Sequence, residues 1–194
     1  MTKLTYEQIL ALRKSEAEAL AGGRHPVIGV LEDIRSLYNV GSCFRTADAM
    51  LLRQLVLTGY TPAPPRAEIS KTALGAERAV PWRKVDDPAV AIEELRADGC
   101  RIWALELTDA STPLTELTAD DLTAPIALVV GNEIGGVRAA TLELCDRAVS
   151  IPMHGVKHSL NVAVAFGIGV WEIVRMLEEG KRERGGGREL KNSN

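Results

Sequence analysis

The chain has 194 residues, of which 46% are hydrophobic. This size suits one compact domain with a buried core and disfavours a second full domain. The net charge of −3 excludes a uniformly basic surface, so any contact with nucleic acid must use local basic patches. Three cysteines without Cys-x-x-Cys spacing disfavour a disulfide framework or a zinc site, and no run of 18 apolar residues suggests a membrane span. We therefore expect a cytoplasmic protein.

The first 24 residues predict a helical extension. Thr5 and Gln8 have the spacing of a capping box, which predicts a helix running to about Leu20, before Gly22 and Gly23. We assign residues 1–24 to this extension.

From Pro26 onward, short apolar runs alternate with helical periodicities. The predicted strands cover residues 27–31, 55–58, 100–107, 126–130 and 148–151, and the predicted helices cover residues 40–52, 89–97, 137–144 and 160–177. Because the strands are almost continuously apolar, we predict an α/β fold with a mostly parallel sheet and helices on both faces. This domain covers residues 25–179, and the polar, glycine-rich residues 180–194 predict a disordered tail.

A polar turn follows the predicted strand that ends at Ile151. Ser159 and Asn161 lie there with free backbone N–H groups, at the strand end where open α/β sheets bind ligands. Ser159 is alternatively a simple helix cap. Asn161 has apolar neighbours in a helix predicted to be buried, where an unpaired amide costs about 1–3 kcal/mol.

A glycine-rich turn, Gly131 to Gly136, follows the predicted strand 126–130. It carries one carboxylate, Glu133, which is either functional or a solvated turn residue. Val137 and Arg138 stand where a phosphate loop requires Lys and Ser or Thr, so a nucleoside-triphosphate site is excluded.

A third polar segment begins the helix predicted after the first strand. Asn39 can cap that helix, and Arg45 lies in its second turn. A guanidinium at this place either binds a phosphate or forms a surface ion pair.

These three segments, in this order, resemble the motifs of the SpoU (TrmH-like) family of SPOUT methyltransferases, and the resemblance covers Val27 to Leu177. It implies a C-terminal deep trefoil knot, which pattern reasoning would not propose because knots are almost absent from other folds. It also implies that S-adenosylmethionine binds in the knot, held mainly by backbone around Leu105 to Leu107, Gly131, Ile151, Met153 and Leu160.

The resemblance further implies methylation of a ribose 2′-hydroxyl of RNA by a homodimer with a shared active site. The implied catalytic residues are Arg45, Asn39, Glu133, Ser159 and Asn161. Arg45 either accepts the hydroxyl proton transiently or orients the RNA phosphate, since guanidinium stays protonated under nearly all conditions.

We prefer tRNA to rRNA as the substrate because the chain offers little surface for gripping a large ribonucleoprotein. The alternatives are an inactive RNA-binding module with the same fold, and a methyltransferase for a small molecule or protein. No metal is expected, because His154 and His158 lie in a loop predicted from Pro152 and Gly155.

Overall fold

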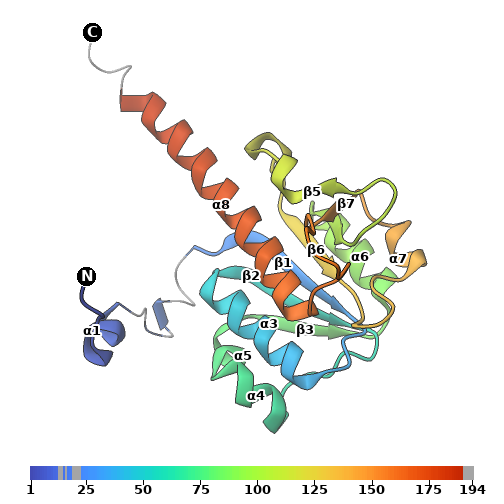
Figure 1. Cartoon of the computed structure of the whole chain (residues 1–194), viewed down its shortest axis with the longest axis horizontal. Helices are drawn as coiled ribbons and strands as arrows, with labels where there is room; N and C mark the ends of the chain where they lie inside the picture. Colours follow the sequence, from blue (N-terminus) through green and yellow to red (C-terminus); the bar gives the residue numbers. More distant parts are fainter. Residues whose placement is uncertain (13–14, 16, 19–22, 190–194) are drawn as a thin grey trace.

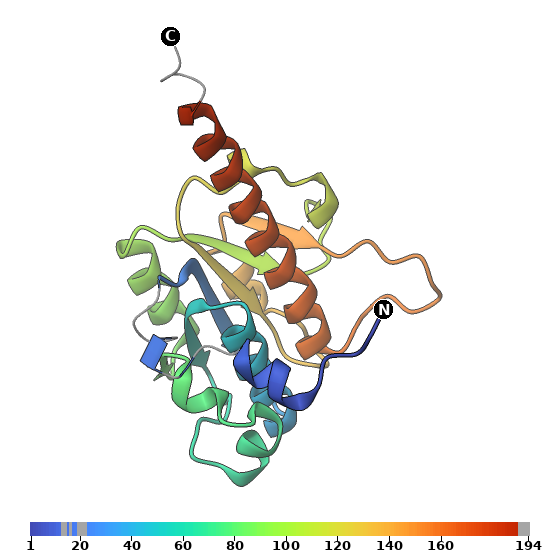
Figure 2. The same ribbon diagram turned by 90° about the vertical axis from the view of Figure 1, so that its left-hand side faces the viewer.

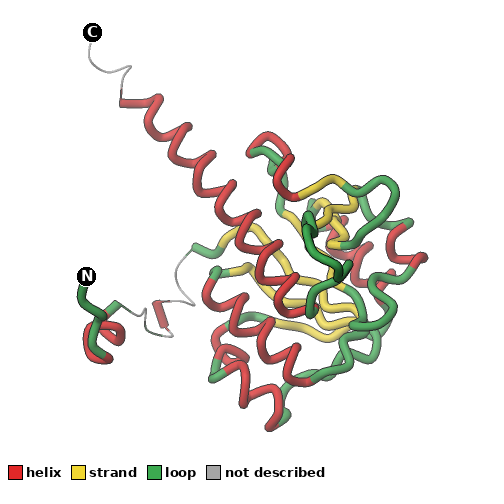
Figure 3. The backbone as a smooth tube through the Cα atoms, viewed as in Figure 1, coloured by secondary structure: helices red, strands yellow, loops and turns green. Residues whose placement is uncertain are grey.

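The computed structural model describes residues 1–12, 15, 17–18 and 23–189, with side chains up to residue 182. A single sheet of seven strands in the order β3-β2-β1-β6-β4-β7-β5 forms its centre (Figure 3). Every pair of neighbouring strands is parallel, which confirms the predicted α/β class. The strands are β1 (His25–Glu32), β2 (Leu52–Thr58), β3 (Trp82–Val85), β4 (Arg101–Leu105), β5 (Thr112–Pro113), β6 (Ile126–Val130) and β7 (Arg147–Ser150).

Helices cover both faces of this sheet (Figures 1 and 2). One hydrophobic core contains Phe44 and Phe166 from two helices on one face, and a second core contains Ile92 and Leu95 from a helix on the other. The helices are α1 (Tyr6–Ala11), α3 (Leu37–Ala49), α4 (Ala67–Ala73), α5 (Ala76–Ala79), α6 (Pro88–Ala97), α7 (Ala139–Leu142) and α8 (Val162–Glu189), with short 3-10 turns at Leu114–Glu116 and Ala119–Asp121.

The central strand β1 shows why the sheet is buried on both faces. Val27 and Leu31 belong to the core beneath α3 and α8, whereas Ile28 and Val30 belong to the core beneath α6. Successive side chains of a strand point to opposite faces, so an uninterrupted apolar run is needed. Gly29 lets α8 approach the strand closely, because a Cβ there would lie 2.7 Å from Cζ of Phe166.

Helix α3 begins earlier than predicted. Ser36, not Asn39, is its N-cap, and the Ser36 side chain accepts a hydrogen bond from the backbone N–H of Asn39. The expectation that Asn39 caps the helix is therefore wrong, which leaves its amide free to bond elsewhere. The helix ends at Ala49, and β2 begins at Leu52, three residues before the predicted start.

The shortest elements of the fold were not predicted from the sequence. Strands β3 and β5 lie at the two edges of the sheet and contain four and two residues, too few for a periodicity to be recognised. Helices α4 and α5, with seven and four residues, were not predicted for the same reason.

The helices at the two ends of the chain differ in length from the predicted ones. Thr5 and Gln8 form the predicted capping box, but α1 ends at Ala11 with Leu12 as its C-cap, well before the predicted end near Leu20. The rest of the predicted helix lies partly outside the described residues. At the other end, α8 continues to Glu189. The tail predicted to be disordered from Gly180 is thus helical up to that residue, and residues 190–194 lie outside the description. An ion pair between Glu178 and Lys181, three residues apart, supports the helix here.

Within the described residues, no helix has the length and apolar character that crossing a membrane would require.

Candidate active site

A cavity of 680 Å³ opens at the carboxyl ends of β4, β6 and β7, the edge at which parallel sheets bind ligands. Its walls are the Gly131–Gly136 turn after β6, the long loop between β7 and α8, and the residues that follow β4. In Figure 2 the loop between β7 and α8 projects from the side of the sheet. All the positions predicted for the cofactor line this cavity, namely Leu105, Leu107, Gly131, Ile151, Met153 and Leu160.

The Gly131–Gly136 turn is closed by its own hydrogen bonds. Asn132 and Gly136 exchange two backbone bonds of 2.9 Å, and Oδ1 of Asn132 accepts from the N–H groups of Ile134 and Gly135. The chain passes so close to itself that a Cβ on Gly131 would lie 2.1 Å from the carbonyl carbon of Gly136 and from the nitrogen of Val137. Only glycine fits at the first position of this turn.

Glu133 ties the turn to the N-terminus of α3. Its Oε2 accepts from the N–H of Arg35 at 2.9 Å, and its Oε1 accepts from the N–H of Ser36 at 3.0 Å and from Nδ2 of Asn39 at 2.9 Å. Burial opposes ionisation of this carboxyl, but these hydrogen bonds outweigh it and hold the pKa of Glu133 below its ordinary value. A negative group at a helix N-terminus also interacts favourably with the helix dipole.

Asn161 continues this connection from the other side. Its Nδ2 donates to Oδ1 of Asn39 at 3.1 Å, and its Oδ1 accepts from the N–H of Ala163 at 3.0 Å, at the beginning of α8. Asn39, Glu133 and Asn161 therefore form one chain of side-chain hydrogen bonds that joins three separate segments. We call it the Glu133–Asn39–Asn161 chain.

Two of the predicted catalytic residues stand apart from that chain. Ser159 lines the cavity, but within the described part of the protein it makes no hydrogen bond to the Glu133–Asn39–Asn161 chain. Arg45 lies on the exposed side of α3 and does not line the cavity. The surface ion pair considered for Arg45 finds no acidic partner among the described residues.

Glu106 lies within the backbone range predicted for the cofactor, but its carboxylate was given no role. Its Oε1 accepts from the N–H of Leu107 and its Oε2 from the N–H of Val137, both at 2.9 Å. The carboxylate thereby joins the end of β4 to the Gly131–Gly136 turn, two walls of the cavity. The signal was present in the sequence, since Glu106 separates the predicted cofactor residues Leu105 and Leu107.

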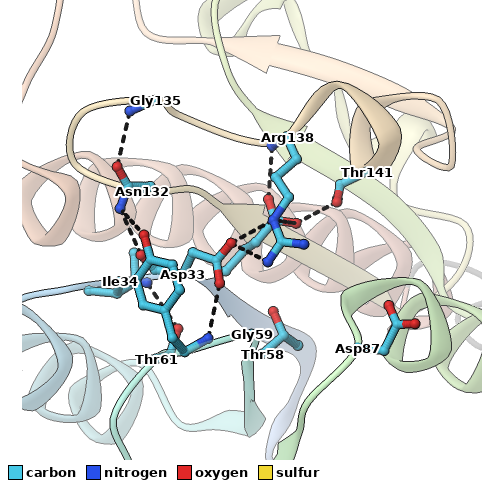
Figure 4. Close-up of polar contacts among 12 residues, drawn as sticks. Asp33, Ile34, Thr58, Gly59, Thr61, Asp87, Asn132, Gly135, Arg138 and Thr141 are labelled. Carbon is cyan, nitrogen blue, oxygen red and sulfur yellow. Dashed lines mark hydrogen bonds and ion pairs between the residues drawn. The ribbon is translucent and has the colours of Figure 1, made fainter.

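A buried acidic pair anchors the far side of the turn (Figure 4). Asp33, 5% exposed, accepts from Nε of Arg138 at 2.5 Å and from the N–H of Tyr60 at 3.0 Å, and its carbonyl accepts from Nδ2 of Asn132. Glu32, 1% exposed, accepts from the N–H of Arg138 at 3.0 Å. The hydrogen bond that Arg138 donates to Asp33 raises the pKa of Arg138. The end of β1 thus holds the turn and the start of α7.

Among the described residues, no three side chains of His, Cys, Asp or Glu gather as a metal site would require. Cys43 and Cys100 are buried, and Cys145 is partly buried. Burial raises the pKa of the Cys43 thiol and raises that of Cys145 to about 12, so both are protonated near neutral pH and neither has the character of a nucleophile.

Comparison with known proteins places this geometry in a family. The SpoU rRNA Methylase family matches residues 26–171. The 23S rRNA (guanosine-2'-O-)-methyltransferase RlmB of Haemophilus ducreyi is 38% identical over 158 residues, which are 81% of this chain and 63% of that protein. The chain thus spans less than two thirds of the length of this curated relative.

Solved structures agree. The TrmH/SpoU tRNA modifying enzyme of A. aeolicus is 30% identical with a TM-score of 0.75, covering 86% of this chain and 82% of that one. An AdoMet-bound rRNA methyltransferase from Sinorhizobium meliloti is 28% identical with a TM-score of 0.73, covering 80% of this chain and 58% of that one. This chain belongs to the SpoU rRNA methylase family.

Proposed function

We propose that this protein transfers a methyl group from S-adenosylmethionine to a ribose 2′-hydroxyl of RNA. The observation that carries the proposal is the cavity at the sheet edge, lined by every position predicted for the cofactor and bordered by Glu133 of the Glu133–Asn39–Asn161 chain. The name of the related RlmB specifies 2'-O-methylation of guanosine in 23S rRNA, and the S. meliloti structure is that of an AdoMet-bound rRNA methyltransferase.

The residues of the cavity fit the cofactor. Leu105, Ile151 and Leu160 supply apolar walls suited to an adenine ring, and Gly131 allows backbone to approach closely because no Cβ could fit there. When bound, S-adenosylmethionine supplies an electrophilic methyl group on a sulfonium. The protein must then hold the ribose oxygen in line with that methyl group.

We assign Arg45 to the binding of a phosphate of the RNA. It is exposed, it has no acidic partner in the described part of the chain, and it belongs to the helix whose N-terminus Glu133 holds. A guanidinium in this state is suited to bidentate binding of a phosphate, which orients the neighbouring ribose. The proton of the hydroxyl leaves either to that phosphate or water, or transiently to Arg45. Ser159 borders the cavity at the same site.

We propose ribosomal RNA as the substrate. The tRNA preference drawn from the small size of the chain finds no support in the curated relatives, whose names specify guanosine in 23S rRNA. Size is a weak argument here, since the part of RlmB matched by this chain is only 63% of that protein.

We further propose a homodimer with a shared active site. Val164, Ile168 and Trp171 follow one another at helical spacing on α8 and are 51%, 40% and 58% exposed. Such an apolar stripe on an exposed helix face favours burial against another protein surface, and a second copy of this chain is the occupant we assign. The trefoil knot belongs to the same proposal. It is supported by the match to the family and by the cavity that the Gly131–Gly136 turn shares with the loop between β7 and α8.

The test is transfer of labelled methyl from S-adenosylmethionine to transcripts of 23S rRNA and of tRNA. We expect the intact protein to methylate the 23S transcript, and we expect Arg45→Ala to lower the rate by a factor of about 10² or more. Arg53→Ala, which removes another exposed arginine on β2, should leave the rate unchanged. Methylation of neither RNA by the intact protein would overturn the proposed function, and an equal rate for the two variants would overturn the role of Arg45.

A further inference from the structure

An exposed tyrosine stands beside the candidate active site. Tyr38 is 48% exposed and directly precedes Asn39 of the Glu133–Asn39–Asn161 chain. Its carbonyl oxygen accepts hydrogen bonds from the hydroxyl of Ser42 at 2.9 Å and from that of Thr72 on α4 at 3.0 Å. Both helices therefore fix the backbone at Tyr38, while its ring remains open to solvent.

A lysine accompanies this ring. Nζ of Lys71, in α4, lies 6.0 Å from the centroid of the Tyr38 ring, within the range of a cation–π contact. Within the described residues, Lys71 has no acidic partner, and the same holds for Arg45. Lys71 beside the ring and Arg45 farther along α3 thus place two cations on this surface of a chain whose net charge is −3.

Tyr38 and Arg45 lie on the same face of α3. They are seven residues apart in one helix, which amounts to two turns and a rise of roughly 10 Å. A row with an aromatic ring at one end and a guanidinium at the other matches the alternation of base and phosphate along a nucleic-acid strand.

We propose that Tyr38, with Lys71 beside it, is a stacking platform for a nucleobase of the RNA strand next to the methylated ribose. This inference rests on the proposed function and names the surface that receives the substrate. The ring stacks on the base, Lys71 lies close to the negative backbone, and Arg45 binds a phosphate two helical turns away. Stacking accepts any base, because every base has a π-face. The platform thus adds affinity and positions the strand without choosing its sequence.

The platform is tested by binding of two fluorescent 12-nucleotide single-stranded RNAs, one of mixed sequence and one whose central nucleotides are abasic. We expect the intact protein to prefer the RNA with all its bases. Tyr38→Ala should weaken binding of that RNA by about 5- to 150-fold and abolish the preference. Tyr38→Phe should keep the preference because the ring remains. Val90→Ala, which trims an exposed apolar side chain on α6 at the other face of the sheet, should change nothing.

Lys71→Gln supplies a second readout: the negative slope of log binding constant against log salt concentration should become less steep by about 0.7. Equal binding of both RNAs by the intact protein, or an equal loss for both in Tyr38→Ala, would overturn the stacking role. A change in the molar mass of Tyr38→Ala in light scattering would overturn it too, since the ring would then serve a subunit contact. If only the inference is wrong, the intact protein will still methylate 23S rRNA. If the proposed function is wrong, it will not.

Discussion

The replacement of Gly131 by alanine tests the geometry of the cavity most directly. In the structure, the new Cβ would lie 2.1 Å from the carbonyl carbon of Gly136, 2.2 Å from its oxygen and 2.1 Å from the nitrogen of Val137. All three atoms are backbone, so no side-chain rotation relieves the overlap. The turn must move as a unit, and its hydrogen bonds to Glu106 and Asp33 must stretch or break with it.

The expected cost is that of inserting a methyl group into packed structure, about 1–3 kcal/mol. For a chain of this length, each kcal/mol lowers the melting temperature by about 2–4 °C, so Gly131→Ala should melt about 2–12 °C below the intact protein. A displacement of about 1 Å beside the reacting groups should also lower the rate of methyl transfer by about 10²-fold.

Gly135 provides the matched control within the same turn. A Cβ added at Gly135 would have Oδ1 of Asn132 as its nearest neighbour, at 4.0 Å, which is an ordinary contact. The free energy of unfolding of Gly135→Ala should therefore stay within about 0.5 kcal/mol of that of the intact protein. Thermal unfolding by circular dichroism and titration calorimetry with S-adenosylmethionine measure both variants. Equal melting temperatures and equal cofactor affinities for Gly131→Ala and Gly135→Ala would refute the steric argument.

Two further predictions concern the polar contacts of the turn. Arg138→Ala leaves the buried Asp33 without its cation, and we expect a loss of about 1–3 kcal/mol in urea unfolding. Arg83→Ala breaks a surface pair with Glu94 and should cost less than about 1 kcal/mol, so equal losses would contradict this interpretation. The pKa of Glu133 is lowered on folding, so its stabilisation is present above the ordinary pKa and disappears as the pH falls through the folded one. Melting temperatures from pH 7 to 3 should therefore show Glu133→Gln below the intact protein at neutral pH and converging with it in acid. A difference in melting temperature that stayed constant from pH 7 to 3 would contradict a stabilising role of the ionised Glu133 carboxylate.

Local patterns in the sequence determined the central strands and the cavity wall. The strand Ile126–Val130 has the predicted bounds, because a run of five apolar residues lies between Pro125 and Gly131. A strand buried on both faces must be apolar throughout, and a parallel strand must end where its ligand-binding loop begins. The positions expected to hold the cofactor line one cavity for the same reason.

Only the tertiary structure decided which polar groups meet. Asn39 looked like a helix cap, yet Ser36 caps the helix and Asn39 bonds to Glu133, which is 94 residues away in the chain, and to Asn161, which is 122 away. No local pattern encodes such distances. The separation of Arg45 from the cavity likewise depends on how α3 packs on the sheet. Periodicity reports the environment of each residue, whereas hydrogen-bond partners depend on how distant segments fold together.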